Sequence, residues 1–204
     1  MKPPKLVRAV TMALLLAVTS VPLMSSTAVA QNKLEINKVA EKKLKHLPAG
    51  PLFWRVETMP TIAQAQAAAG ETSLAAEISG KVWLFTLGAK GGLTPGATKV
   101  IEIGPVPPIT APEYLLRINH AFGPPGAKTS VHTHPGSEAF YVLAGHLGQR
   151  TSHGVSHADA GQSMNGHGAD MPMEVFSAGT VDLDQLVMFV VDATRPFSSP
   201  AKFE

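Results

Sequence analysis

The 204-residue sequence contains no cysteine. Without thiols the chain has no disulfide bonds, and thiolate chemistry of any kind is excluded as well. Stability must therefore come from a hydrophobic core alone. A composition of 45% hydrophobic residues supplies such a core for one domain of this length.

The sequence also lacks an apolar run long enough to span a membrane. Its most apolar stretch, residues 12–21, follows three basic residues within the first eight positions. The small-residue sequence Ala-Val-Ala then occupies residues 28–30. This order is typical of a secretory signal peptide. We therefore predict a signal peptide over residues 1–30, cleavage between Ala30 and Gln31, and a periplasmic or secreted mature protein.

The sequence also has no large excess of positive or negative charge. Removing residues 1–30 takes away three of the 17 basic residues and none of the 15 acidic ones. The mature chain then has 14 basic and 15 acidic residues, a net charge of −1. This balance offers no electrostatic basis for binding nucleic acid or an acidic membrane surface. We expect no nucleic-acid partner and no membrane insertion of the mature form.

The strongest chemical signal lies in residues 126–145, GAKTSVHTHPGSEAFYVLAG. His132 and His134 are two residues apart, so on a β-strand both imidazoles project from the same face. Pro135 and the glycine after it turn the chain, and Glu138 opens a second strand that can fold back beside the two imidazoles. Two neutral imidazoles and one carboxylate would bind divalent iron, manganese, zinc, nickel or copper.

The spacing of this stretch resembles the first conserved motif of the cupin family. Gly126 is followed after five residues by His132-x-His134, then after three residues by Glu138 and after six residues by Gly145. Cupins are small antiparallel β-barrels or jelly rolls that hold a metal, when they hold one, inside the barrel. The resemblance implies that His132, His134 and Glu138 are metal ligands.

The family's second motif, which ends in a further ligand histidine, is matched here only by its first glycine, Gly161. Pro172 occupies the strict position of that histidine, and a shift by one residue in either direction places Met171 or Met173 there. Three alternatives remain for the fourth ligand: water, a thioether from one of these methionines, or His167 from the nearby turn. A thioether would favour copper, although methionine in a barrel interior more often fills the core.

Short apolar segments with turn signals at intervals of about eight to twelve residues independently predict an all-β sandwich or barrel. We expect an antiparallel cupin barrel or jelly roll over residues 81–195 and a loose C-terminal tail over residues 196–204. An N-terminal extension with short helices is expected over residues 31–80. Within it, residues 31–47 are expected to form a loosely packed helix or arm, and residues 61–69 a helix. The motif does not recur, which excludes a duplicated barrel.

Other residues are weaker candidates for the site. Tyr141, His120 and His167 are potential pocket residues. His120 shares a strand face with aliphatic side chains, which favours a hydrogen-bonded core or rim histidine over a metal or substrate contact. His153 and His157 are expected to be exposed on a hairpin, and their irregular spacing argues against a surface metal site.

Three functions are compatible with these features. The first is an exported metal-dependent enzyme, an oxidoreductase or lyase with oxygenase-like or decarboxylase-like chemistry on a small molecule, whose metal is iron, manganese or copper. The second is a barrel that binds a small molecule without turnover. The third is a copper-handling protein that uses the histidines and methionines of residues 164–173. A homodimer is expected by analogy with other open barrels.

Overall fold

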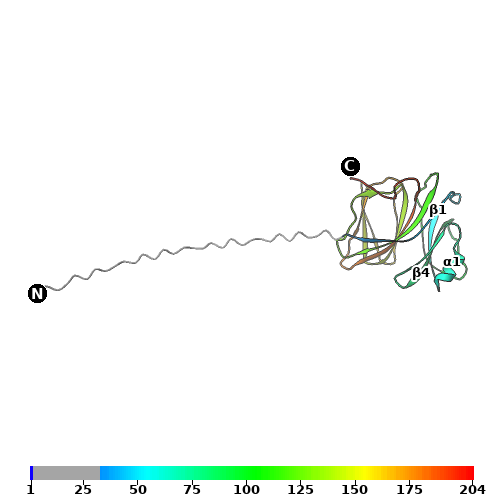
Figure 1. The fold of residues 1–204 in the computed structure, drawn as a ribbon, viewed down its shortest axis with the longest axis horizontal. Coiled ribbons are helices and arrows are strands. Elements are labelled where there is room, and N and C mark those ends of the chain that lie inside the picture. The colour runs from blue at the N-terminus through cyan, green and yellow to red at the C-terminus, as the bar shows by residue number, and fades with distance from the viewer. Residues whose placement is uncertain (2–32) are drawn as a thin grey trace. The chain divides into compact units, whose positions relative to one another are not determined.

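The computed structural model describes Met1 and residues 33–204. Apart from Met1, the predicted signal peptide lies outside the described residues. Figure 1 shows that the described part is built mainly of strands. In chain order the elements are β1 (Glu35–Leu44), β2 (Phe53–Met59), α1 (Ile62–Ala68), β3 (Ser73–Ile78), β4 (Lys81–Gly88), β5 (Thr98–Ile103), β6 (Tyr114–Gly123), β7 (His132–Thr133), β8 (Gly136–Ala144), β9 (His146–Thr151), β10 (Gly154–Asp159), β11 (Ser163–Asn165), β12 (Met173–Ser177), β13 (Leu183–Asp192) and β14 (Ser199–Pro200).

Strands β6 to β13 form a jelly roll of two antiparallel sheets. One sheet has the order β6-β13-β8-β11, and the other has the order β7-β12-β9-β10. If β6 to β13 are renumbered 1 to 8, the two sheets have the orders 1-8-3-6 and 2-7-4-5. These orders are those of two interlocked Greek keys. The prediction of an all-β antiparallel jelly roll is confirmed.

Strand β13 is buried on both faces because a further sheet covers the outside of the jelly roll. Its residues Val187 and Phe189 belong to the core between the two barrel sheets. Leu186 and Met188 belong to a second core, which also contains Trp54 of β2. The unbroken apolar run over residues 186–191 follows from having protein on both sides of the strand.

The covering sheet is formed by β2 to β5, in the order β3-β4-β2-β5. Strands β4 and β5, which fall within the 81–195 range expected for the barrel, therefore pair with strands of the N-terminal segment. The predicted helix over residues 61–69 is found as α1. Its first turn is capped by Thr61, whose Oγ1 accepts a hydrogen bond of 3.2 Å from the Gln64 backbone N–H.

The segment over residues 31–47 was expected to be a loosely packed helix or an arm, and its described part forms no helix. Residues 35–44 form strand β1, which pairs antiparallel with β6 along the edge of the barrel sheet. Helix propensity is a weak preference that tertiary contacts often override, and β6 offers an unpaired row of backbone N–H and C=O groups. A charged, mostly exposed strand is also a typical edge strand.

The C-terminal tail is not loose, in contrast to the prediction for residues 196–204. Strand β14 pairs with β7, and the Ala201 backbone N–H donates a hydrogen bond of 3.0 Å to the Val131 carbonyl. The Phe197 ring packs at 5.0 Å from the Phe189 ring, centroid to centroid. The tail therefore forms part of the barrel wall beside β7.

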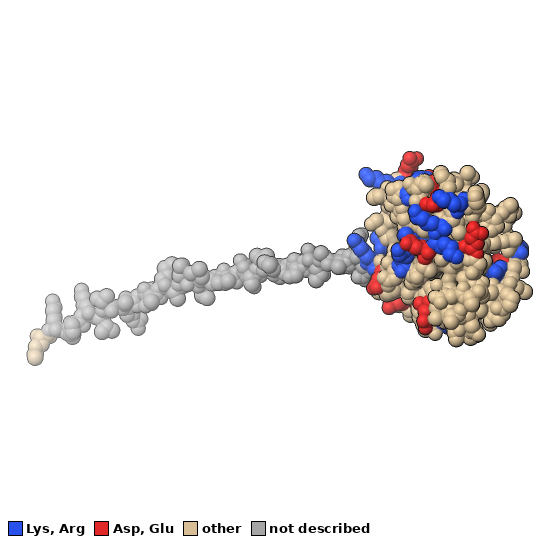
Figure 2. Space-filling model, turned by 45° about the vertical axis from the view of Figure 1, so that its right-hand side comes forward, with Lys and Arg blue, Asp and Glu red and all other residues tan. Residues whose placement is uncertain are grey.

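The surface carries both signs of charge close together. On the face drawn in Figure 2, lysine and arginine are interspersed with aspartate and glutamate. Lys43 and Lys45 both pair with Glu113, at 3.1 and 2.8 Å. Within residues 33–204, no helix is long and apolar enough to cross a membrane.

Candidate functional site

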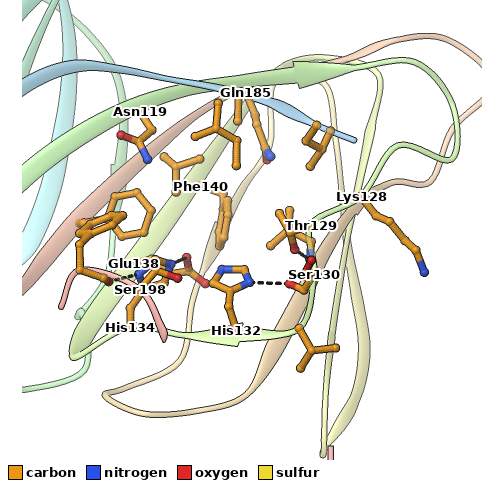
Figure 3. Close-up of a pocket in the computed structure, with 18 of the residues that line it drawn as sticks. Asn119, Lys128, Thr129, Ser130, His132, His134, Glu138, Phe140, Gln185 and Ser198 are labelled. Carbon is orange, nitrogen blue, oxygen red and sulfur yellow. Dashed lines mark hydrogen bonds and ion pairs between the residues drawn. The ribbon is translucent and has the colours of Figure 1, made fainter. Parts of the chain in front are cut away.

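A cavity of about 620 Å³ lies in the jelly roll. In the view of Figure 3, His132, His134 and Glu138 lie at one side of this pocket, and Asn119 and Gln185 lie at the other. The structure thus brings together the three side chains of the predicted motif. They reach the pocket from β7, from the turn that follows it, and from β8.

The two histidines are held by backbone carbonyls. Nδ1 of His132 lies 2.8 Å from the Ser130 carbonyl oxygen, and Nδ1 of His134 lies 2.6 Å from the Phe197 carbonyl oxygen. Because a carbonyl oxygen only accepts, both Nδ1 atoms carry the proton and donate it. A neutral imidazole in this tautomer has its lone pair on Nε2, which is the usual arrangement of a metal-binding histidine.

His134 is held in its neutral form. Burial lowers the pKa of His134 from 6.5 to about 4, and the hydrogen bond to the Phe197 carbonyl opposes this shift only in part. The neighbouring charges of His132 and Arg117 lower the pKa further. A neutral imidazole at physiological pH is the state that binds a metal.

Glu138 is a buried carboxyl group with few polar contacts to offset the cost of its burial. Its side chain is 3% exposed, Oε1 accepts a hydrogen bond of 2.7 Å from Gln149 Nε2, and Oε2 lies 3.9 Å from His134 Nε2. Burial raises the pKa of Glu138 from 4.5 to about 8, and the Gln149 hydrogen bond opposes the shift. Among the described residues, neither lysine nor arginine forms an ion pair with it. A metal cation would supply the missing positive charge.

These groups do not form a ready coordination shell as they stand. Within residues 33–204, no set of three or more histidine, aspartate or glutamate side chains is close enough to hold a metal ion. The donor set nevertheless fits one, because two imidazoles and a carboxyl that has no cationic partner among the described residues face one cavity.

Met173 is the only one of the three candidates for a fourth ligand that the structure places beside the motif residues. It is 1% exposed, pairs across the sheet with His132, and has its Sδ 3.4 Å from Gln149 Nε2. The Met171 Sδ contacts Ser152 Oγ at 3.8 Å. The ring of His167 lies 6.2 Å from that of His153. None of the three lines the cavity.

Tyr141 and His120 do not line the cavity that contains the histidine motif. The Tyr141 ring packs edge-on against Trp83, 6.3 Å between centroids, on the face covered by the N-terminal sheet. Alternation along β8 explains this correction, since Glu138 and Phe140 take the inward positions. Nε2 of His120 lies 2.6 Å from Asp184 Oδ1, in agreement with a hydrogen-bonded rim histidine.

Four residues of the site were missed from the sequence. Gln149 occupies an inward position of β9, and side-chain alternation along the β9–β10 hairpin could have identified it. Asn119 and Gln185 could have been found as polar residues inside apolar strands. Phe197, which holds His134, carries no local signal because the contact joins residues 63 positions apart.

Comparison with known proteins identifies related folds only. No family model matches the chain, and no curated protein sequence matches it. Solved structures similar to part of the chain include the DMSP lyase DddQ from Ruegeria pomeroyi, with 18% identity and a TM-score of 0.37 over 42% of this chain and 43% of that one. A cupin-like protein from Thermotoga maritima has 15% identity and a TM-score of 0.39 over 43% of this chain and 65% of that one.

A third structure, a protein with a double-stranded β-helix domain from Klebsiella pneumoniae, has 18% identity and a TM-score of 0.37 over 43% of this chain and 75% of that one. The matched region spans less than two thirds of the first two proteins, and likenesses at this level say nothing about activity. The strand order is the stronger observation, since it is that of a complete jelly roll with the histidine motif on its second and third strands. The described chain therefore has a jelly-roll fold, which is the fold that the resemblance of its histidine motif to that of the cupins implied.

Proposed function

We propose that this protein is an exported, metal-dependent enzyme of the oxidoreductase or lyase class that acts on a small molecule in the barrel cavity. His132, His134 and Glu138 would hold one divalent transition metal. The observation that carries the proposal is the fixed orientation of both imidazoles, each with Nδ1 bonded to a backbone carbonyl. A surface histidine pair has no need of such support.

The residues around these three have separate roles. Gln149 fixes the Glu138 carboxyl through its 2.7 Å hydrogen bond. Phe140, Val187 and Phe189 make the cavity wall apolar and limit the entry of water. A bound metal would supply Lewis-acid or redox chemistry at coordination positions that the protein leaves open.

Two alternatives make different predictions about the metal. A copper-handling protein is favoured by the sulfur of Met173 beside Gln149, and it would bind Cu(I) most tightly. A binding module without turnover would hold a small molecule whether or not a metal is present. Iron or manganese in the purified protein supports the enzyme and argues against copper handling.

The test is elemental analysis of the mature protein, purified without a histidine tag from the compartment to which it is exported. His132→Ala and Glu138→Ala are compared with His153→Ala, a control because His153 is exposed on a hairpin. We expect close to one metal per chain in the wild type and the control, and loss of metal in both site variants. A wild type that carries no metal and gains none on reconstitution would overturn the proposal.

A further inference from the structure

Two amide side chains line the pocket at the side away from the histidines. Asn119 lies on β6 and Gln185 on the neighbouring strand β13, where Gln185 pairs with Ala121. The two amides therefore project from the same face of adjacent strands, as diagonal neighbours. Figure 3 shows both at the same end of the pocket, with Phe140 between them and His132 in that view.

Both amides are buried and contain polar atoms without a hydrogen-bond partner among the described residues. Gln185 is 1% exposed and Asn119 is 6% exposed. Among the described residues, neither the Nε2 nor the Oε1 of Gln185 has a hydrogen-bond partner, and the Oδ1 of Asn119 has none either. Buried polar groups of this kind are normally paired, because leaving them unpaired costs stability. Three unpaired atoms together at a cavity wall indicate a site that a ligand completes.

The other side chains that line the pocket indicate which kind of ligand would pair with the two amides. Ala121, Phe140 and Val187 also line the pocket and offer no side-chain donor or acceptor. Two lysines line it as well, Lys33 and Lys128, and Lys128 is paired with Glu174 at 3.0 Å. Among the described residues, neither lysine forms a hydrogen bond with Asn119 or Gln185, so a ligand group bound by the two amides need not be charged.

We propose that Asn119 and Gln185 bind a primary carboxamide at the end of a ligand with an apolar body. The three protein atoms present two acceptors and one donor, and a primary carboxamide presents two N–H donors and one carbonyl acceptor. Exchange of N and O in the Gln185 amide leaves this match unchanged, because both atoms are unpaired. The inference rests on the proposed function in taking the cavity as the substrate site.

A carboxylate ligand fits this end less well. It has no hydrogen to donate, so its oxygens would face the unpaired oxygens of Asn119 and Gln185. The apolar wall would at the same time remove its charge from water, and the two amides carry no charge to offset this cost. The proposed substrate class is thus a small amide whose other end reaches the metal-binding side chains.

The experiment compares hexanamide with 2-heptanone, which replaces the NH₂ group by a methyl group of similar size. Binding to the mature protein is measured by ligand-observed NMR, first with its metal and then after chelation. We expect hexanamide to bind about tenfold more tightly, the effect of one to two additional hydrogen bonds. Equal binding of the two compounds, or no binding of either, would overturn the inference.

Variants of the two amides test whether these side chains cause the preference for hexanamide over 2-heptanone. Gln185→Met and Asn119→Leu should each reduce the preference for hexanamide several-fold, while Gln66→Met on the exposed face of α1 leaves it unchanged. Gln185→Met should also raise the Tm of the ligand-free protein, because it removes an unpaired buried amide. A lower Tm would show that the protein already satisfies this amide, which contradicts the inference.

The metal and the amide preference are measured separately, so the two proposals fail separately. A protein that has no metal but retains the preference for hexanamide refutes the proposed metal-dependent function and supports the amide site. A protein with one metal per chain and no preference keeps the metal-dependent function and refutes the amide site.

Discussion

Two glycines at the ends of the histidine motif have different physical roles. Gly126 and Gly145 both have φ near +79°, a left-handed conformation that side chains disfavour. A Cβ on Gly126 would meet open space, whereas one on Gly145 would lie 2.5 Å from the Asp182 carbonyl oxygen. The spacing of the motif shows where these glycines lie, but only packing distinguishes them.

Gly145→Ala is therefore expected to destabilise the protein more than Gly126→Ala. The Gly126 variant should lose roughly 1–2 kcal/mol of unfolding free energy, the cost of the left-handed conformation. The Gly145 variant should lose about a further 1–3 kcal/mol from overpacking against Asp182 and Leu183. Urea unfolding of both variants measures the difference, and equal losses would contradict the clash.

Gln149 supports the proposed metal site without being a ligand. Its hydrogen bond fixes the Glu138 carboxyl, so we expect Gln149→Leu to lower metal affinity by about 10–100-fold. Competition with a chelating dye measures that affinity. Gln66→Leu, on the exposed face of α1, is the matched control and should bind metal like the wild type. Unchanged affinity in Gln149→Leu would show that Glu138 is held by other contacts.

At the scale of elements, the C-terminal tail is the segment that joins the site to the rest of the barrel. The Phe197 ring lies 4.8 Å from that of His134 and 3.9 Å from the guanidinium carbon of Arg117. Arg117 is in turn held by Glu41 of β1, with Nη2 at 2.7 Å from Oε2. Strand β1 and the tail thus support the same histidine from opposite ends of the chain.

Deletion of residues 197–204 should weaken metal binding by about tenfold or more, because His134 loses the carbonyl that orients its ring. Metal titration of the purified variant tests this. Deletion of residues 202–204 alone is the control, since it keeps Phe197 and strand β14. If both deletions bind metal equally well, the tail has no part in orienting His134.

At the scale of the whole molecule, the N-terminal sheet protects one face of the jelly roll. Trp54, Phe85 and Leu87 pack against Leu116 and Met188 of the barrel. A chain that begins at residue 113 should therefore expose this face and bind the dye ANS or aggregate, whereas the chain 31–204 should not. Light scattering distinguishes the two, and a monodisperse 113–204 barrel would show that the N-terminal sheet is dispensable.

Export is a prediction that concerns the full-length chain. The mature protein recovered from the periplasm or medium should begin at Gln31. Intact mass determination measures the N-terminus, and recovery of uncleaved protein from the cytoplasm would contradict the prediction. The same sample, examined by light scattering, tests the expected homodimer.

Local features of the sequence were enough to predict most strands and the cluster of His132, His134 and Glu138. Strand alternation and turn residues act over a few positions, and they place these three side chains without knowledge of distant contacts. For the same reason the capped helix after Pro60 was predicted correctly. Metal binding by the cluster stays a prediction.

Contacts between distant segments decided the remainder. Residues 35–44 became a strand because β6 offered an open edge, and the outward face of β8 that carries Tyr141 is packed because the N-terminal sheet covers it. Phe197, Gln149 and Gln185 acquire their positions from strands that meet only in the folded chain. The sequence by itself determined the all-β class through periodicity and the donor groups through spacing, and the resemblance of the motif to that of the cupins implied the jelly roll. Only the tertiary structure decided what supports those donors and what faces them across the cavity, because strand pairing over long separations has no local signature.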